Sequence, residues 1–183
     1  LSLNHPHVVR LEARQAGFDG SGEISIRDLG RNCLRMRPDR VVVGEVRGAE
    51  VMDMLQAMST GHDGSMATIH ANSPRECLDR MEMLAGFAGF QGSEQSLRRQ
   101  IASAIDFIIQ IGRLPNGKRR ILSITEIIGV SDTVITTQEL YKHQLITGPD
   151  QEEKDEWNFL GIKPHNPKLR AYNPHHREPA ALN

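Results

Sequence analysis

The sequence predicts an α/β fold that ends in a small antiparallel β extension. Strand-like and helix-like segments alternate from residue 7 to residue 105, which is the order of a sheet with right-handed crossovers. Residues 40–46, RVVVGEV, form an uninterrupted β-branched run, which is typical of a parallel strand buried on both faces. After residue 107 the pattern changes to strands joined by the turn Pro115-Asn116-Gly117, which indicates hairpins.

Composition limits the class of protein. The 183 residues carry a formal net charge of −1, and 38% of them are hydrophobic, which is enough for one domain with a core. A charge near zero argues against bulk binding to nucleic acid or to an anionic membrane. The two cysteines, Cys33 and Cys77, form no CxxC pair, which excludes a disulfide framework and fits a reducing compartment. No apolar run is long enough to span a bilayer. Because the sequence begins at Leu1 in mid-pattern, without a signal peptide, we expect it to be a fragment.

The first elements follow from local signals. Residues 7–12, HVVRLE, are expected to form a short strand before a glycine-rich loop. Ser25 is expected to cap a helix, with Asp28 completing a capping box and Pro38 stopping the helix. One face of that helix is apolar, and the opposite face carries Arg27, Arg31 and Arg35.

Further helices and one more strand are expected before residue 105. Residues 50–60 have an apolar stripe at helical spacing, and Gly61 is a candidate for the residue that ends this helix. Residues 65–70, SMATIH, are expected to form a short strand. Ser73 and Pro74 predict the start of another helix, as an N-cap followed by a first-turn proline. A last helix is indicated by the apolar residues Leu97, Ile101 and Ile105.

The extension is expected to contain three antiparallel strands, at residues 107–114, 119–128 and 134–143. We therefore expect one domain over residues 1–147. Residues 148–183 are rich in proline and polar side chains, and we expect them to form an extended tail.

Glu45 is the first candidate for a functional side chain. It ends the buried run at 40–46, and the carboxyl ends of parallel strands face the ligand crevice of α/β folds. A glutamate there can orient a water, or a water bound to Mg²⁺, against a phosphate. Arg47 lies two residues later, where it can neutralise a phosphate or pair with Glu50.

His62 and His70 flank the strand expected at residues 65–70. They are eight residues apart, so they do not form a helical metal pair, and no third ligand has convincing spacing. We expect this strand to lie beside the strand that carries Glu45. His70 would then face a phosphate across the strand ends, whereas the structural alternative is a pair of ordinary polar residues.

Three segments carry a resemblance to a known family: GEVRGAE at 44–50, TGHDGS at 60–65 and TIHANSP at 68–74. They resemble the Walker B segment and the histidine box of the ATPases of type II secretion, type IV pili and type IV secretion. The flanking segments LRMRPDRVVVGEVRGAE, HVVRLEAR and GRLPNGKRRILSITEIIGV are most similar to the CpaF-like branch, the ATPases of tight-adherence (Flp) pili. The resemblance covers roughly residues 3–145.

This resemblance implies a RecA-like P-loop NTPase core, of which residues 1–147 would be the C-terminal part. Glu45 would be the Walker B glutamate, His70 the histidine-box residue and His62 its companion. ATP and Mg²⁺ are the implied cofactors, with Mg²⁺ reached from Glu45 through a water and no direct metal ligand. The acidic box and the glycine-rich phosphate loop of the family would precede Leu1.

One stretch imitates the phosphate loop. Residues 112–119, GRLPNGKR, fit the pattern GxxxxGK but end in Arg119, where the pattern needs Ser or Thr for Mg²⁺. A strand-like run follows instead of a helix, so we expect a hairpin turn. Lys118 is the first lysine of the chain, so the segment with the Glu45 and His70 motifs has no lysine for the phosphates. We therefore expect half of a nucleotide site and no tight ATP binding by this chain alone.

Arginine is abundant where lysine is absent. In hexameric ATPases some arginines reach across a subunit boundary to the transferred phosphate. Arg10, Arg14 and Arg47 are our candidates for this role, although a solvated surface is the simpler explanation for any single arginine. No aromatic residues are interleaved with the arginines, so we expect no nucleic-acid partner.

Together these features predict ATP hydrolysis that powers pilus assembly or protein secretion. The resemblance implies a homo-hexamer that is cytoplasmic, peripheral at the inner membrane face, and that contacts inner-membrane platform proteins. Two alternatives remain open. The first is an oligomerising subunit or truncated remnant without catalysis, and the second is a DNA-translocating motor, for which the sequence shows no basic aromatic loop.

Overall fold

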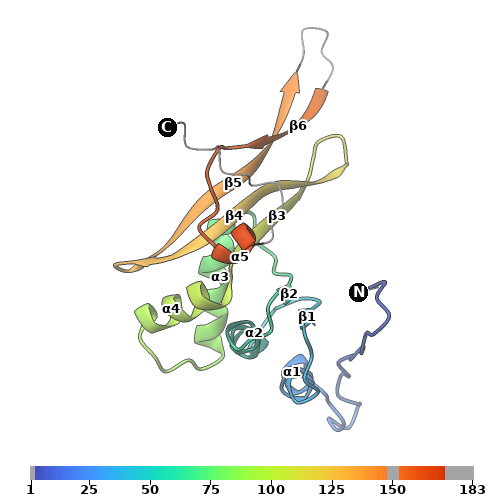
Figure 1. The fold of residues 1–183 in the computed structure, drawn as a ribbon. Helices are drawn as coiled ribbons and strands as arrows, with labels where there is room; N and C mark the ends of the chain where they lie inside the picture. The colour runs from blue at the N-terminus through green and yellow to red at the C-terminus, as the bar shows by residue number, and fades with distance from the viewer. Residues whose placement is uncertain (1–2, 148–152, 172–183) are drawn as a thin grey trace. The chain divides into compact units, whose positions relative to one another are not determined.

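The structure is a computed structural model that describes residues 3–147 and 153–171 (Figure 1). Contacts within the chain divide it after Ile105 into two units, and each unit is described by itself. The first unit holds four helices and a short parallel strand pair. The second unit is a four-stranded antiparallel sheet followed by a short helix.

Helix α1 (Ile26–Leu34) begins at the predicted cap. The Ser25 hydroxyl accepts a hydrogen bond from the Asp28 N–H, and the Asp28 carboxylate accepts one from the Ser25 N–H, so the capping box is confirmed. The helix ends at Leu34, before the proline that we expected to stop it.

The strand expected at residues 40–46 is confirmed in place but is shorter. Strand β1 (Val42–Val43) pairs in parallel with β2 (Met66–Ala67). Backbone bonds extend this ladder on both sides, from the Met66 N–H to the Val41 carbonyl (2.9 Å) and from the Val46 N–H to the Thr68 carbonyl (2.9 Å). Since β2 is the only neighbour of β1 among the described residues, just one side of the predicted buried strand is paired.

The strand predicted at residues 7–12 is wrong. These residues form no regular ladder, and the side chains of Val9 and Leu11 are exposed. A strand needs a neighbour to accept its backbone hydrogen bonds, and no described segment lies in that position. The chain instead makes a single antiparallel bridge between Arg14 and Ile24.

Three further helices build the core of the first unit. They are α2 (Glu50–Ser59), α3 (Pro74–Phe87) and α4 (Glu94–Ala104), and the predicted cap Ser73 accepts a hydrogen bond from the Glu76 N–H. The predicted apolar stripes face inward, as the exposed fractions show. The buried apolar residues of this unit are Val46, Val51, Met54, Leu55, Ala57, Cys77, Leu78, Met81, Leu84, Ala85, Leu97, Ile101 and Ala104.

The second unit confirms the predicted antiparallel extension. Its strands follow one another in the order β3 (Phe107–Arg113), β4 (Arg119–Ser131), β5 (Val134–Thr147) and β6 (Glu153–Phe159). The fourth strand lies in the segment 148–183, for which we expected no strand. Of that segment, residues 148–152 and 172–183 lie outside the described residues, and helix α5 (Pro167–Ala171) ends the described part.

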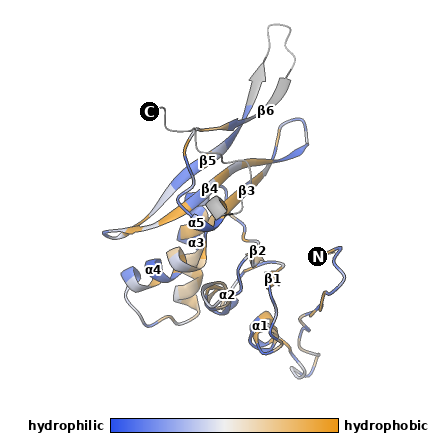
Figure 2. Cartoon of the chain, in the orientation of Figure 1, coloured by the Kyte–Doolittle hydropathy of each residue, from blue (hydrophilic) through white to orange (hydrophobic). Residues whose placement is uncertain are grey.

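The pattern GRLPNGKR forms a turn between β3 and β4, as predicted. The Leu114 N–H donates to the Lys118 carbonyl (2.8 Å), and the Gly117 N–H donates to the Leu114 carbonyl (2.8 Å). Gly117 has a φ of +80°, a conformation that glycine adopts without strain. Figure 2 shows this turn in hydrophilic colours. Because a strand follows the turn, these residues do not form a phosphate loop.

A buried carboxylate joins the sheet to the segment after β6. Glu126 of β4 is 0% exposed and accepts hydrogen bonds from the N–H groups of His165 (2.8 Å) and Asn166 (2.6 Å). The Gln138 amide of β5 donates to it as well (2.5 Å). Burial raises the pKa of Glu126, but the three donors outweigh burial and hold the pKa below its ordinary value. The ionised carboxylate therefore anchors this segment to the sheet.

Candidate functional site

The parallel pair β1–β2 brings Glu45 and His70 together. Both residues follow the carboxyl end of their strand, and the two strands run side by side. The Nε2 atom of His70 lies 2.8 Å from Oε1 of Glu45. The Thr68 hydroxyl also donates a short hydrogen bond to the Gly44 carbonyl, which ties the two strand ends to each other. The predicted proximity of the two motifs is therefore confirmed.

Arg47 completes this cluster from the turn after Glu45. Its Nη2 atom lies 2.5 Å from Oε2 of Glu45, so the side chain pairs with Glu45 and not with Glu50. Glu50 instead accepts hydrogen bonds from the backbone N–H groups of Arg47 (2.6 Å) and Gly48 (3.0 Å). This carboxylate takes the place of a side-chain cap at the start of α2, where Ala49 offers none.

The electrostatics of the cluster favour an ionised Glu45. The Arg47 guanidinium lowers the pKa of the Glu45 carboxyl, partial burial acts in the opposite direction, and His70 adds to the lowering. Glu45 in turn raises the pKa of Arg47. The Glu45 side chain is 24% exposed, whereas those of Arg47 and His70 are 72% and 79% exposed. The cluster is thus a half-buried carboxylate flanked by two exposed side chains that can meet an anion.

The segment after His70 is fixed by its own polar contacts. Asn72 donates to the Glu76 carboxylate through its N–H (3.1 Å) and its side-chain amide (2.8 Å). Ser73 caps α3 at the same point. The sequence showed the cap but not the Asn72–Glu76 pair, whose spacing of four residues is the available signal.

His62 lies at the other end of β2 and does not join Glu45 in this structure. Its Nδ1–H donates to the Ala57 carbonyl (3.0 Å), in the last turn of α2. Gly61 and Gly64 on either side have φ values of +84° and +81°, which explains the two glycines of the TGHDGS segment. His62 therefore adds a side-chain donor at the end of the helix, to a carbonyl that also accepts hydrogen bonds from Thr60.

The N-terminal arginine candidates lie on loop backbone. Arg14 donates from Nε to the Gly22 carbonyl (2.6 Å) and closes the loop that leads to α1. Arg10 is exposed, and no side chain in the described part of the chain pairs with it. The strand on which both were expected to flank the site is not present.

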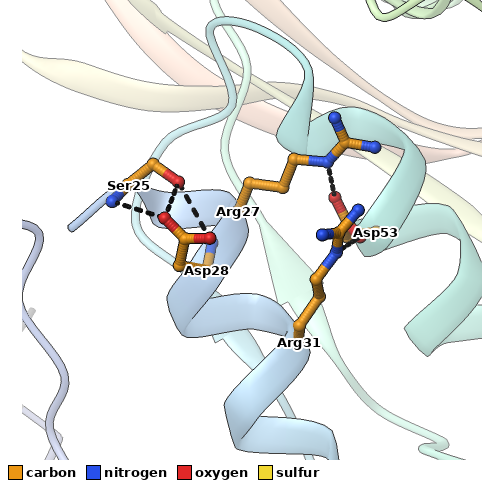
Figure 3. Close-up of polar contacts among 5 residues, drawn as sticks. All are labelled: Ser25, Arg27, Asp28, Arg31 and Asp53. Atoms are coloured by element: carbon orange, nitrogen blue, oxygen red, sulfur yellow. Dashed lines mark hydrogen bonds and ion pairs between the residues drawn. The ribbon is translucent and has the colours of Figure 1, made fainter. Parts of the chain in front are cut away.

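Two arginines of α1 share one acidic partner on α2, which was not predicted from the sequence. Arg27 and Arg31 of α1 both reach Asp53 of α2 through their Nε atoms, at 3.0 and 3.4 Å (Figure 3). Their spacing of four residues and the acid in the first turn of the next helix were the available signals. These side chains line an open groove of about 500 Å³ together with Leu34, Arg35, Met52, Gln56 and Gln100. The excess of guanidinium groups makes this groove attractive to anions.

Direct metal ligands are not found in the described residues. No three acidic, histidine or cysteine side chains there gather in a way that could hold a metal ion. Glu45 has one carboxylate and two cationic or hydrogen-bonding neighbours, which suits a water or a phosphate better than a bare cation. No described helix is long and apolar enough to cross a bilayer.

Comparison with known proteins agrees with the motifs at this site. The model of the type II/IV secretion system protein family matches residues 1–145. The chain belongs to this family. Both Glu45 and His70 lie inside the matched region, and so do the four helices of the first unit and the strands β3 and β4.

Two of the similar proteins carry names that refer to conjugal transfer. One relative, named as a conjugal transfer protein of Mycobacterium tuberculosis, is 48% identical to this chain over 124 residues. These residues make up 68% of this chain and 35% of that protein. The conjugal transfer protein TrbB of Rhizobium radiobacter is 36% identical over 54% of this chain and 29% of its own length. The chain thus spans about a third of the length of the curated relatives it matches.

A solved structure is similar as well. The VirB11 ATPase of the Brucella suis type IV secretion system, determined with bound sulfate, matches with a TM-score of 0.52 and 28% identity. The match covers 55% of this chain and 31% of VirB11. It supports a mixed α/β fold of the secretion ATPase type.

Proposed function

We propose that the full-length protein hydrolyses ATP and uses the energy to drive secretion or pilus assembly. The observation that carries the proposal is the placement of Glu45 at the carboxyl ends of two parallel strands, between Arg47 and His70. Family membership supports it, and so does the likeness to VirB11, an ATPase whose structure was determined with the anion sulfate. The residues 1–147 would form the C-terminal part of a RecA-like core.

Glu45 acts on the water in this mechanism. Its carboxylate accepts a proton from a water, the water oxygen bonds to the γ-phosphorus, and the bond from that phosphorus to the bridging oxygen breaks. ADP leaves with the electron pair, and Glu45 passes its proton to the phosphate product or to solvent. His70 reports the presence of the terminal phosphate to the segment that enters α3, and Arg47 neutralises phosphate charge.

The chain fits one side of a Mg·ATP complex. The ionised Glu45 can hold a water of the Mg²⁺ shell, and Mg²⁺ when bound neutralises charge that develops on the phosphates. The described residues lack a phosphate loop, since GRLPNGKR is a hairpin turn. We propose that the loop comes from a part of the full-length protein that this sequence does not span. His62 would then shape the histidine box from the end of α2.

The assembly belongs to the proposal as well. We propose a homo-hexamer, cytoplasmic and peripheral at the inner membrane face, that works with inner-membrane platform proteins and does not contact nucleic acid. Arg10 and Arg14 are proposed to reach the site of a neighbouring subunit. The motifs favour the CpaF-like branch of Flp pili, whereas the relatives named for conjugal transfer favour type IV secretion as the second candidate.

The test is the charge-neutral variant Glu45→Gln in the full-length protein. It should still bind ATP and lose steady-state hydrolysis by roughly 10²-fold or more, the scale of a lost general base. Glu23→Gln is the matched control, because Glu23 is an exposed carboxylate in a loop of the same unit. If Glu45→Gln hydrolyses ATP at the wild-type rate, the role of Glu45 is structural and not catalytic. A wild-type protein without ATPase activity would favour the inactive oligomerising subunit.

A further inference from the structure

The two oxygens of the Glu45 carboxylate are held differently: Oε2 pairs with Arg47, whereas Oε1 is buried and accepts no hydrogen bond among the described residues, although His70 lies near it. Arg47 Nη2 lies 2.5 Å from Oε2, and His70 Nε2 lies 2.8 Å from Oε1. A carboxylate that accepts a proton from water needs an oxygen that the water can reach at hydrogen-bond distance. In this arrangement Arg47 covers Oε2, and Oε1 is buried.

The backbone and the side chain of Arg47 are held differently. Its backbone N–H is fixed by Glu50 (2.6 Å), and the neighbouring Gly48 N–H is fixed by the same oxygen (3.0 Å). Its side chain is 72% exposed, and Glu45 is its only partner in the described part of the chain. The guanidinium can thus leave Glu45 by rotation of the side chain, without any change in the backbone of the turn.

The backbone beside Glu45 is fixed. The Val46 N–H donates to the Thr68 carbonyl (2.9 Å), and the Val46 side chain is 1% exposed, so the backbone after Glu45 is locked to β2. His70 lies on the other oxygen and comes from the β2 side. Movement of Arg47 would therefore uncover Oε2, whereas Oε1 would stay buried.

We propose that Arg47 gates Glu45: its guanidinium covers Oε2 as it does in this structure, and the terminal phosphate of a bound nucleotide draws it away and frees this oxygen for water. A terminal phosphate carries more negative charge than a carboxylate and offers several oxygens to the planar guanidinium, so it competes well for Arg47. This inference rests on the proposed function of Glu45 as the base and adds how that base is switched on.

The gate also changes the basicity of Glu45. Arg47 from the turn and His70 from the segment after β2 are the charged or titratable groups that face this carboxylate. Arg47 is the larger influence that lowers the pKa of Glu45. When the guanidinium moves to the phosphate, the pKa of Glu45 rises and the carboxylate becomes a better base. Hydrolysis is thereby suppressed until a nucleotide with a terminal phosphate is in place.

A double-mutant cycle on nucleotide binding tests the gate. The four full-length proteins are the wild type, Glu45→Gln, Arg47→Gln and the double variant, and the dissociation constants for ADP and a non-hydrolysable ATP analogue are measured for each. Glu45→Gln releases Arg47 in advance, so it should tighten binding of the ATP analogue about tenfold, a coupling typical of side chains in contact. In the Arg47→Gln background this gain should disappear. The gain should also be smaller for ADP, which lacks the terminal phosphate.

The competing explanation is that the Glu45 charge simply repels the phosphate. If repulsion alone acts, removal of the Glu45 charge helps binding equally or more in the Arg47→Gln background, and such additivity would overturn the gate. An equal gain for ADP would overturn the role of the terminal phosphate. If Arg47→Gln does not fold, Arg47→Ala replaces it in the cycle. Hydrolysis by Glu45→Gln at the wild-type rate would contradict the proposed function itself. Additive effects of the two substitutions on binding would contradict only the gate.

Discussion

At the scale of single residues, His70 has one partner and little packing. Its side chain is 79% exposed and meets Oε1 of Glu45. A side chain so placed adds little to stability, because removal of an exposed group leaves no cavity. Its contribution must therefore be sought in the behaviour of Glu45 and of the anion that approaches it.

We predict that His70→Ala in the full-length protein keeps its ATP affinity within a few-fold and its melting temperature within about 2 °C. Most of the ATPase activity should be lost, since the contact to Glu45 and to the phosphate is gone. Melting and ATPase rate are measured on the same preparation, with His7→Ala, an exposed histidine, as the control. Normal activity per folded molecule would reject a sensing role.

The residue scale also shows where sequence reasoning stops. The proximity of Glu45 and His70 was predictable, because parallel strands share an edge. The partner of Arg47 was not, because Glu45 and Glu50 both lie within reach of its long side chain. The choice depends on side-chain rotation, which the order of residues does not encode.

At the scale of elements, the helix starts were predicted best, because their signals lie within a few residues of one another in the sequence. The capping box at Ser25 and the proline after Ser73 were readable because each depends on residues at most three apart. The strands were less certain, since a strand depends on a distant neighbour: residues 7–12 have none in the described chain, and β6 was hidden in a polar, acidic segment. Glu126 was missed because its donors follow about forty residues later.

The contact of Glu126 with the segment after β6 makes a prediction about pH. The folded-state pKa of Glu126 is lowered, so its contribution to stability is complete above the ordinary value of 4.5 and is lost as pH falls below it. Glu126→Gln keeps the shape of the side chain but removes the negative charge that faces the backbone N–H groups of His165 and Asn166. It should cost about 2 kcal/mol of unfolding free energy at pH 7.

This difference should shrink as the pH falls below 4.5, where the wild-type carboxyl also becomes protonated. Urea unfolding is followed by the fluorescence of Trp157, the single tryptophan of the chain, which lies in β6. Glu139→Gln on β5 is the matched control, because Glu139 is partly exposed and its ion-pair partner among the described residues is Lys142 (3.5 Å). A constant difference between pH 3 and pH 7 would show that the charge of Glu126 does not anchor the segment.

At the scale of the whole molecule, the proposed function gives this chain the water-activating side of a nucleotide site. The described residues contain no turn between a strand and a helix that would cradle phosphates, and the first lysine is Lys118 in a hairpin. We therefore predict that the 183-residue chain alone binds Mg·ATP only weakly. Calorimetry measures this directly, and a micromolar dissociation constant would contradict the half-site.

The central claim is that Glu45 activates the water that attacks ATP, and a single-turnover experiment on the full-length protein tests it most directly. ATP is bound first, and the cleavage of the bound nucleotide is then followed in the wild type and in Glu45→Gln, so that binding and product release do not enter the rate. The account predicts that Glu45→Gln binds ATP but cleaves it at least about 100-fold more slowly. Cleavage of bound ATP at the wild-type rate would contradict it.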